Sequence, residues 1–420
     1  MWQWFASPSG QRWLARALLL YAVVGFFVWI RRPGDFAGYV VVGDLVRAGG
    51  HIYRDAPPGL NTWPPFFSLL CVPLSVLATV SPYLARGLWL LLNVALVVLL
   101  LNLLARLLYG RALSVIPRAS LVCIGAPEMV VPLLLSDRYV SGNFDHIQVN
   151  IVVFALALGG LYRQRTGRET SGSMLLGLAA ALKVMPVVFI PYLAYRRRWR
   201  AAITTTAVVA MCSLSPVLVF GWSRFWDYLW AWRDALRAGW GVGKMNQSVF
   251  AMWDRFVGHG LMPFSSPGVN DLAESGHPIV NVAVAVTFIV VVSVAWWVLR
   301  DGPPNDDWEA LAEWSAVFIV ASIFGPVAWK AYLVVLLLPN ALLFAAWRTE
   351  RLDARGRRTA GYFLLAAFLF GALSMPGLLG GGIAGRLEMS SFVTVAALVL
   401  LSGSLWLRAT LAQQRSTLTR

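Results

Sequence analysis

The chain has 420 residues, of which 58% are hydrophobic and 13% are charged, and its mean hydropathy is +0.66. Soluble domains carry about 25% charged residues, so this composition excludes a soluble protein and indicates an integral membrane protein. The net charge of +15 would suit nucleic-acid binding, but most Lys and Arg residues fall in short tracts beside apolar segments. Because such tracts are typical of the positive-inside rule, we expect the partner to be the lipid bilayer and not nucleic acid.

The first apolar segment, residues 14–30, is predicted to span the membrane. Arg12 and Arg16 precede it, which predicts that the N-terminus is cytoplasmic. The segment lacks a small-residue cleavage site, so we interpret it as a retained span and not as a signal peptide. Residues 31–82 then form a first extracytoplasmic loop, with an interfacial helix predicted over 35–46.

Residues 64–80 leave two topologies open, because they are apolar but short and Pro73 interrupts them. If they cross the membrane, 173–195 is one span with Lys183 near the bilayer middle. If they only dip into the membrane from outside, 173–195 is a broken hairpin with Lys183 at its tip. Dipping keeps an excess of Lys and Arg inside and avoids a mid-span lysine, which costs about 2.5 to 3.5 kcal/mol. We therefore favour the dipping arrangement.

The dipping arrangement predicts an all-α, single-domain bundle of about twelve transmembrane helices, with both termini in the cytoplasm and a re-entrant or interfacial helix in the first outer loop. Two further extracytoplasmic loops are predicted at 136–147 and 221–277. The loop 221–277 contains a Trp-rich amphipathic stretch over 222–240. We expect this loop to act as a lid on the side from which an acceptor substrate would enter. After the first span, the predicted helices are 83–106, 119–135, 148–162, 173–183, 186–195, 201–220, 278–299, 309–324, 332–347, 359–375 and 391–408.

Polar side chains in these outer regions match the needs of sugar transfer from a lipid phosphate. The reaction requires a carboxylate to accept a proton from the acceptor hydroxyl, and Asp35 is the candidate. It also requires cations that stabilise the leaving phosphate, and the candidates are Lys183, Lys330 and Arg138. Candidate groups for orienting the sugars are Tyr39, Asn143, Asp145, His146, Gln148, Asn246 and Gln247.

Each of these features also has a purely structural interpretation. Asp35 could pair with a neighbouring arginine at the lipid surface, and Lys183 could extend to the interface from a helix end. Asp145 and His146 would suit a metal pair, but adjacent residues point in different directions, and we expect no metal. The tryptophans of 222–240 could equally form an interfacial aromatic belt.

Several short motifs follow one another along the chain: DFAGY at 35–39, GHIY at 50–53, WPP at 63–65, QVN at 148–150, GLAAALKVMP at 177–186, RRRW at 196–199, NQS at 246–248 and GPVAWKAY at 325–332. Their order resembles glycosyltransferase family 87 of the GT-C superfamily, which includes mycobacterial polyprenyl-phosphate-mannose-dependent mannosyltransferases and an arabinofuranosyltransferase. One motif departs from the family pattern, because the family commonly has histidines after the Trp where this chain has Lys330.

The resemblance implies an inverting transfer of a mannose- or arabinofuranose-class sugar from a polyprenyl-phosphate donor to an extracytoplasmic glycan or glycolipid. It places the catalytic base at Asp35, the enzyme in a bacterial inner membrane and the active site on the outer face. It implies no obligatory metal, and we expect no other cofactor.

Two other classes of protein would share these features. A transporter or lipid flippase would use Asp35 and Lys183 as coupling charges, and a catalytically silent scaffold for envelope assembly would use neither. An enzyme releases polyprenyl phosphate from its donor, whereas a transporter does not.

Overall fold

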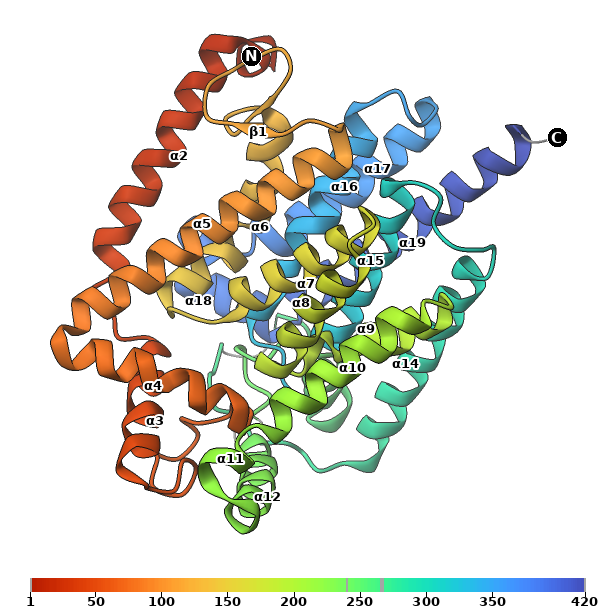
Figure 1. Cartoon of the computed structure of the whole chain (residues 1–420). Helices are drawn as coiled ribbons and strands as arrows, with labels where there is room; N and C mark the ends of the chain where they lie inside the picture. The colour runs from red at the N-terminus through yellow and green to blue at the C-terminus, as the bar shows by residue number, and fades with distance from the viewer. Residues whose placement is uncertain (1, 239–240, 265–267, 419–420) are drawn as a thin grey trace. The chain divides into compact units, whose positions relative to one another are not determined.

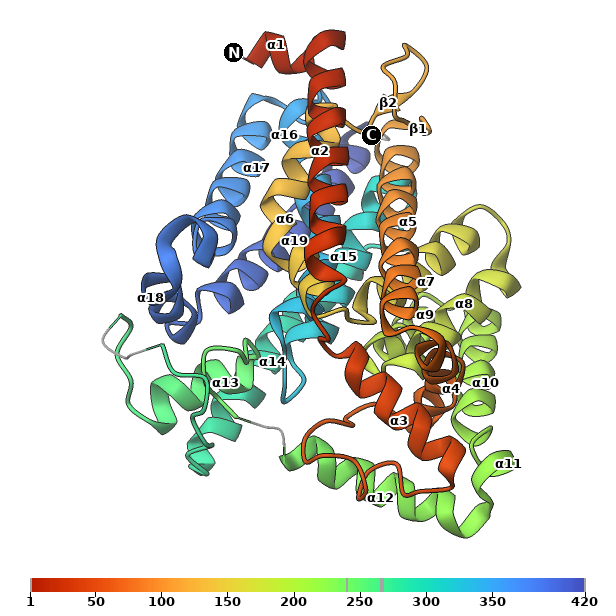
Figure 2. The same cartoon turned by 90° about the vertical axis from the view of Figure 1, so that its left-hand side faces the viewer.

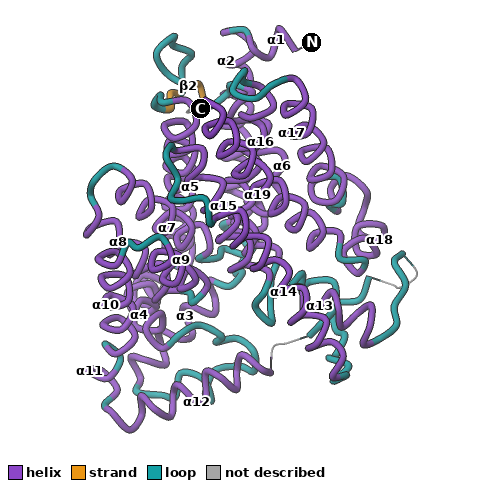
Figure 3. Tube along the Cα trace, turned by 90° about the vertical axis from the view of Figure 1, so that its right-hand side faces the viewer, coloured by secondary structure: helices purple, strands orange, loops and turns teal. Residues whose placement is uncertain are grey.

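The computed structural model describes residues 2–238, 241–264 and 268–418, and helices dominate it (Figures 1 and 3). The two strands, β1 (Leu113–Ser114) and β2 (Val122–Cys123), pair in parallel with Leu113 opposite Val122. The predicted all-α class is therefore confirmed.

The chain forms two compact units. Unit 1 contains Met1–Leu18, Leu104–Val140 and Gly241–Arg420, and unit 2 contains Leu19–Leu103 and Ser141–Trp240. Three helices have residues in both units, namely α2 (Pro8–Trp29), α5 (Pro82–Tyr109) and α6 (Pro127–Asp145).

Unit 2 contains the first outer loop of the sequence interpretation and the hairpin region around Lys183. Its helices, apart from the parts of α2, α5 and α6, are α3 (Phe36–Ala48), α4 (Pro65–Val80), α7 (Asn150–Arg165), α8 (Glu169–Leu182), η1 (Met185–Val188), α9 (Phe189–Tyr195), α10 (Trp199–Leu214), α11 (Val217–Phe220) and α12 (Trp222–Ala238).

Unit 1 contains most of the C-terminal half. Its further helices are α1 (Trp2–Ala6), α13 (Val249–Trp253), η2 (Asp254–Gly258), α14 (Pro278–Leu299), α15 (Asp307–Ile323), η3 (Lys330–Leu336), α16 (Leu337–Arg348), α17 (Ala354–Ala367), η4 (Phe368–Ala372), α18 (Pro376–Met389) and α19 (Phe392–Leu418).

Six helical segments of the described chain are long and apolar enough to cross a membrane, and a seventh is obtained if two helices bent by 77° count as one span. The chain is therefore a multi-pass membrane protein, but length and composition qualify only about half of the twelve helices predicted. The six segments are Pro8–Trp29, Pro82–Tyr109, Trp199–Phe220, Pro278–Leu299, Lys330–Arg348 and Phe392–Arg415, and the bent pair is Ala354–Ala372 with Pro376–Met389.

The predicted helix over 119–135 and the predicted loop over 136–147 need correction. The helix begins at Pro127, because proline is well suited to the first helical position, and it continues to Asp145. The polar residues after 135 suggested a loop, but tertiary partners satisfy them inside the helix. For example, the buried Ser136 hydroxyl accepts a hydrogen bond from Asn340 at 2.9 Å.

The helix predicted over 35–46 is present as α3, and Gly49, with a φ of 72°, follows its last residue, Ala48. Gly43 lets α3 lie against α4, since a Cβ at that position would be 2.4 Å from the carbonyl oxygen of Cys71. The long loop predicted at 221–277 contains α12, α13 and η2, and the last two residues of the stretch 222–240 lie outside the described residues.

The helix α12 lies alongside the chain that follows α3 (Figure 2). Tyr228 donates a hydrogen bond to the Gly50 carbonyl at 3.1 Å, and Trp232 donates one to the Thr62 carbonyl at 3.0 Å. Trp222, Trp226 and Trp230 recur every fourth residue on its exposed face. These contacts fix the Trp-rich helix to the loop that carries Asp35.

Candidate active site

A tight turn at residues 34–35 places Asp35 against the segment that follows α6. Gly34 has a φ of 50°, and a Cβ there would lie 2.3 Å from the carbonyl oxygen of His146, so only glycine fits this approach. The Asp35 backbone N–H donates to the same carbonyl at 2.7 Å. Ile147 is held at a φ of 49°, a conformation that a β-branched residue rarely adopts.

The Asp35 carboxyl group is half-buried, and Lys183, His146 and Gln148 surround it. Burial raises the pKa of Asp35 above its ordinary value, because it disfavours the charged form. The positive charges of Lys183 and His146 and a hydrogen bond with Gln148 act in the opposite direction. A carboxylate with raised proton affinity next to a lysine is the arrangement that a general base beside an anionic leaving group requires.

Lys183 lies where α8 ends. Pro186 cannot donate to the carbonyl of residue 182 and its ring would clash there, so the α-helix stops at Leu182 and a short 3-10 helix follows. Lys183 itself is extended, with φ −151° and ψ 123°. The predicted break at Lys183 is therefore confirmed, and 173–195 is not one continuous helix.

An amide chain links Lys183 to the segment beside Asp35. The Lys183 ammonium donates to Asn150 Oδ1 at 2.5 Å. The Asn150 amide nitrogen donates to Asn143 Oδ1 at 2.9 Å and to Gln148 Oε1 at 2.6 Å. Asn150 is buried and was not among the predicted site residues, although it belongs to the QVN motif. It connects the cation to the amide groups predicted to orient a sugar.

Asp145 and Tyr39 have structural partners of their own. Asp145 forms an ion pair with Arg32 and thereby fixes the end of α6 to the loop before Asp35. The Tyr39 ring is fully buried, with its centroid 4.7 Å from that of Trp63 and 5.1 Å from that of Phe67. His146, in contrast, is exposed.

The other predicted cations lie in unit 1, where a buried carboxylate holds both of them. Glu388 accepts from Arg138 Nη2 at 2.6 Å and from Lys330 Nζ at 2.8 Å. Arg138 also donates to the Gly371 carbonyl at 3.0 Å and to Ser374 Oγ at 2.6 Å. The sequence interpretation missed Glu388, which lies beyond the last recognised motif, although a single acidic residue in an apolar stretch is itself a signal of function or pairing.

Asn246 and Gln247, also in unit 1, use their amide groups to fix backbone. Asn246 donates to the carbonyls of Gly241 and Pro326 and accepts from the backbone N–H groups of Ser248 and Ala328. Gln247 donates to the carbonyls of Lys244 and Glu388. The structure therefore brings Asp35, Lys183 and the 143–150 segment together in unit 2, and Arg138 and Lys330 together in unit 1.

Comparison with known proteins identifies the chain. The sequence profile of glycosyltransferase family 87 matches residues 61–326, more than half of the chain. The chain belongs to this family. The matched range includes Lys183 and 143–148 and begins after Asp35.

Two curated relatives of the chain come from Mycobacterium tuberculosis. One, from strain ATCC 25618 / H37Rv, is a polyprenol-phosphate-mannose-dependent α-(1-2)-phosphatidylinositol mannoside mannosyltransferase, 26% identical over 70% of this chain and 76% of the relative. The other, from strain CDC 1551 / Oshkosh, is the corresponding phosphatidylinositol pentamannoside mannosyltransferase, 25% identical over 83% of this chain and 76% of the relative. Among solved structures, ArnT from Cupriavidus metallidurans bound to undecaprenyl phosphate aligns with a TM-score of 0.44 and 13% identity, over 92% of this chain and 76% of ArnT.

The chain is thus a multi-pass membrane glycosyltransferase, and the resemblance to family 87 is confirmed. Of the three classes that the sequence left open, the enzyme is the right one, and the transporter and the silent scaffold are wrong. In the part of the chain that the structure describes, no group of three or more His, Cys, Asp or Glu side chains is arranged to hold a metal ion.

Proposed function

We propose that this glycosyltransferase moves mannose from a polyprenyl-phosphate-mannose donor to a glycolipid or glycan acceptor on the outer side of a bacterial inner membrane. The names of both mycobacterial relatives support this donor, and phosphatidylinositol mannosides are the acceptor class that they suggest. Arabinofuranose, the other sugar that the sequence left open, has no support from these relatives.

We propose for this enzyme the topology predicted from its sequence, a single-domain GT-C-type bundle of twelve helices. In this topology residues 64–80 dip into the membrane from outside. Support comes from the length of α4, which has only 16 residues against the ~20 that a perpendicular crossing needs. The break at Lys183 is a second support, because helices interrupted at bilayer depth are tolerated where they line a cavity. In this topology the outer side carries 31–82, the end of α6 and 221–277.

The observation that supports the mechanism is the electrostatic influence of Lys183 on Asp35, since the two residues lie 148 positions apart in the sequence and come within electrostatic reach in one compact unit. Asp35 accepts the proton of the acceptor hydroxyl as that oxygen attacks the anomeric carbon from the side opposite the phosphate. The bond between the anomeric carbon and the phosphate oxygen breaks, and the electron pair leaves with polyprenyl phosphate. The configuration inverts, and no covalent intermediate with the enzyme is needed.

Lys183 is the preferred phosphate ligand, because it lies beside the proposed base and on the broken helix. Lys330 is the second candidate, since it is partly exposed and shares Glu388 with Arg138. Arg138 fits the role less well, because three protein acceptors already take its guanidinium group and its side chain is only 4% exposed.

The sugar contacts are proposed on the segment 143–148, where Asn143, Gln148 and the exposed His146 follow one another beside Asp35. Asp145 serves this segment through its ion pair. We leave Tyr39, Asn246 and Gln247 out of the sugar-contacting set, because the first is enclosed by aromatic rings and the other two hold backbone groups.

The test is a transfer assay with the purified full-length enzyme in liposomes. Radiolabelled polyprenyl-phosphate-mannose should yield free polyprenyl phosphate and a labelled glycolipid when phosphatidylinositol mannosides are present. Polyprenyl-phosphate-arabinose serves as the matched donor and should give no product. Transfer from the arabinose donor alone would refute the mannose assignment.

A further inference from the structure

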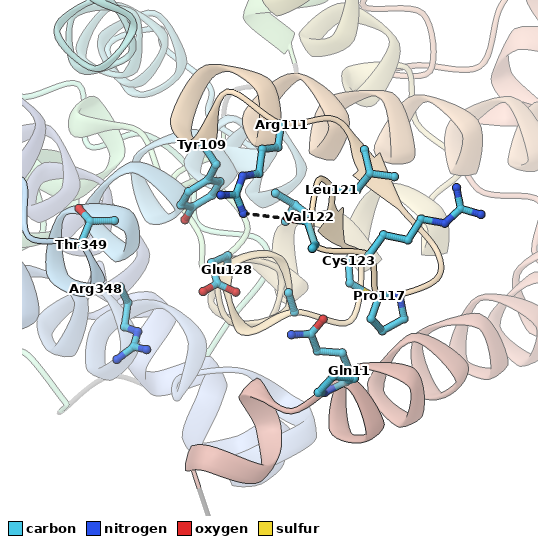
Figure 4. A pocket seen from close by; sticks show the side chains of 14 residues that line it. Gln11, Tyr109, Arg111, Pro117, Leu121, Val122, Cys123, Glu128, Arg348 and Thr349 are labelled. Carbon is cyan, nitrogen blue, oxygen red and sulfur yellow. Dashed lines mark hydrogen bonds between the residues drawn. The ribbon is translucent and has the colours of Figure 1, made fainter.

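A pocket lies in unit 1, away from the candidate site residues. Its volume is about 630 Å³, within the range of roughly 300 to 1,000 Å³ that small-molecule sites have. Gln11, Tyr109 and Arg348 line it, and they lie at the ends of three candidate spans (Figure 4). The pocket is therefore at the level where spans meet the membrane surface, the depth of lipid headgroups.

Charges of both signs line this pocket. Arg111, Arg118 and Arg348 are cationic, and guanidinium groups bind phosphate oxygens through paired N–H donors. Glu128 also lines it, from the first turn of α6, where the helix dipole favours a carboxylate. Among the described residues Glu128 forms no ion pair. A ligand with both charges would match this lining, because the arginines can bind its anionic group and Glu128 its cationic group.

Two hydroxyl groups of the lining are buried and unsatisfied. Within the described chain, Tyr109 Oη and Thr349 Oγ1 have no hydrogen-bond partner, although most buried polar groups in proteins have one. Figure 4 shows the Arg111 guanidinium group beside the Tyr109 ring, with the Glu128 carboxylate below them. A polar ligand in the pocket would supply the missing partners.

We propose that this pocket binds a phosphate group that carries an amine, with the phosphate on Arg111 and Arg348 and the ammonium on Glu128. The Tyr109 and Thr349 hydroxyls donate to the remaining phosphate oxygens. Phosphatidylethanolamine in the membrane and free phosphoethanolamine share this chemistry. The topology proposed above places the pocket on the cytoplasmic side, but the binding itself does not depend on the proposed sugar transfer.

Lipid retention by the full-length protein tests this inference. After reconstitution in an equal mixture of phosphatidylcholine, phosphatidylethanolamine and phosphatidylglycerol, native mass spectrometry should find phosphatidylethanolamine enriched on the wild-type protein. Loss of both cationic partners in the double variant Arg111→Gln/Arg348→Gln should lower this retention by about tenfold or more, as expected when charge-assisted hydrogen bonds are lost. The matched control is Arg106→Gln, which removes an exposed arginine one turn before Tyr109 outside the pocket lining and should change nothing.

Glu128→Gln separates the two charges of the ligand. It should abolish the preference for phosphatidylethanolamine over phosphatidylglycerol while both lipids still bind. Displacement of the lipid by free phosphoethanolamine would identify the headgroup alone as the ligand, and retention despite it would identify the membrane lipid. Equal retention of all three lipids, or retention that neither the double variant nor Glu128→Gln alters, would overturn the proposal. Thermal unfolding of Tyr109→Phe, which keeps the ring and removes one proposed donor, checks that pocket variants fold.

Discussion

At the scale of single residues, the ability of a cationic side chain to bind a donor phosphate depends on the groups that already surround it. Arg138 and Lys330 share a buried glutamate, which offsets much of the positive charge that a phosphate would need. Lys183 instead faces an amide oxygen and the carboxyl group of Asp35, whose pKa is raised by burial. Asp35 becomes neutral when it accepts the proton of the acceptor hydroxyl, so the charge of Lys183 is then available to the leaving phosphate. We therefore prefer Lys183 as the phosphate ligand.

We expect Asp35→Asn to keep the shape of the turn and to remove the proton acceptor. Donor binding should survive, and turnover should fall by about 10² to 10⁴, the usual contribution of a general base. The matched control is Asp44→Asn, in the same helix region, where the carboxylate is exposed and pairs with Arg47 at 3.1 Å. Near-normal turnover of Asp35→Asn together with an inactive Asp44→Asn would show that the base is misassigned.

Lys183→Gln should lower transfer to a small residual rate and also change the pH profile of that rate. The base acts in its ionised form, so the wild-type rate should fall as the pH drops through the raised pKa of Asp35, above the ordinary value near 3.9. Lys183 lowers that pKa, so its removal should shift the acidic limb of the profile to higher pH. The measurement is turnover against pH at saturating donor.

A normal rate for Lys183→Gln would indicate that Lys330 binds the phosphate instead, and Lys330→Gln is therefore the companion variant.

The raised pKa of Asp35 also affects how the stability of the protein depends on pH. Because the folded state holds the Asp35 proton more tightly than the unfolded chain, ionisation lowers the free energy of unfolding as the pH rises. Asp35→Asn should thus be no less stable than the wild type at neutral pH.

At the scale of elements, the ends and breaks of helices position the reactive groups. Pro186 ends α8 at Lys183, and Gly34 turns the chain between α2 and α3 so that Asp35 meets the residues after α6. In unit 1 the carboxylate of Glu388 ties α6 to α18 and to the start of η3. These junctions carry most of the polar groups of interest, while the helix interiors supply apolar packing.

Gly34→Ala should lower turnover and the free energy of unfolding by more than the positive φ of Gly34 alone predicts. A left-handed backbone costs a non-glycine residue roughly 1 to 2 kcal/mol, and here the new Cβ would also collide with His146. Gly49→Ala is the control, since Gly49 has a φ of 72° and nothing within 4 Å of the added atom. Turnover and the free energy of unfolding should both fall more for Gly34→Ala, and equal losses in the two variants would exclude the steric role.

Arg138→Gln should act on stability and not on donor affinity. Breaking a buried ion pair from one side costs about 3 to 5 kcal/mol, because the remaining charge loses a partner, and Lys330 would retain part of that interaction. Unfolding in detergent should therefore occur at lower temperature, and the donor KM of the folded fraction should stay near the wild-type value. A large rise in the donor KM with unchanged stability would instead indicate that Arg138 binds the donor phosphate.

At the scale of the whole molecule, the six to seven candidate spans do not by themselves define how the chain crosses the bilayer. Shorter helices such as α4 and the segment Met185–Tyr195, which joins η1 and α9, are apolar but do not meet the length of a span. The distribution of Lys and Arg favours a dipping 64–80 segment, which in turn places the loop around Arg165 in the cytoplasm. Topology is thus a property that only labelling of the intact membrane protein tests directly.

A cysteine at Thr166, in a background where Cys71, Cys123 and Cys212 are replaced, should not react with an impermeant thiol reagent in intact cells. Pro58→Cys, at an exposed position of the first outer loop, is the positive control and should react. Permeabilised cells should label both. Labelling at position 166 in intact cells would contradict the dipping arrangement and would favour a topology in which residues 64–80 cross the membrane.

The sequence by itself determined the membrane class, the helical fold, α3 with its stop at Gly49, the break at Lys183 and the family. These features depend on composition, short motifs and the local effects of Pro and Gly, which act over a few residues. It misplaced the end of α6, because tertiary partners and not polarity decide whether Ser136 and Arg138 belong to a loop or a helix. Only the tertiary structure brought Asp35, Asn150 and Lys183 together, enclosed Tyr39 and revealed Glu388, since contacts between distant parts of a chain depend on packing that no local pattern records.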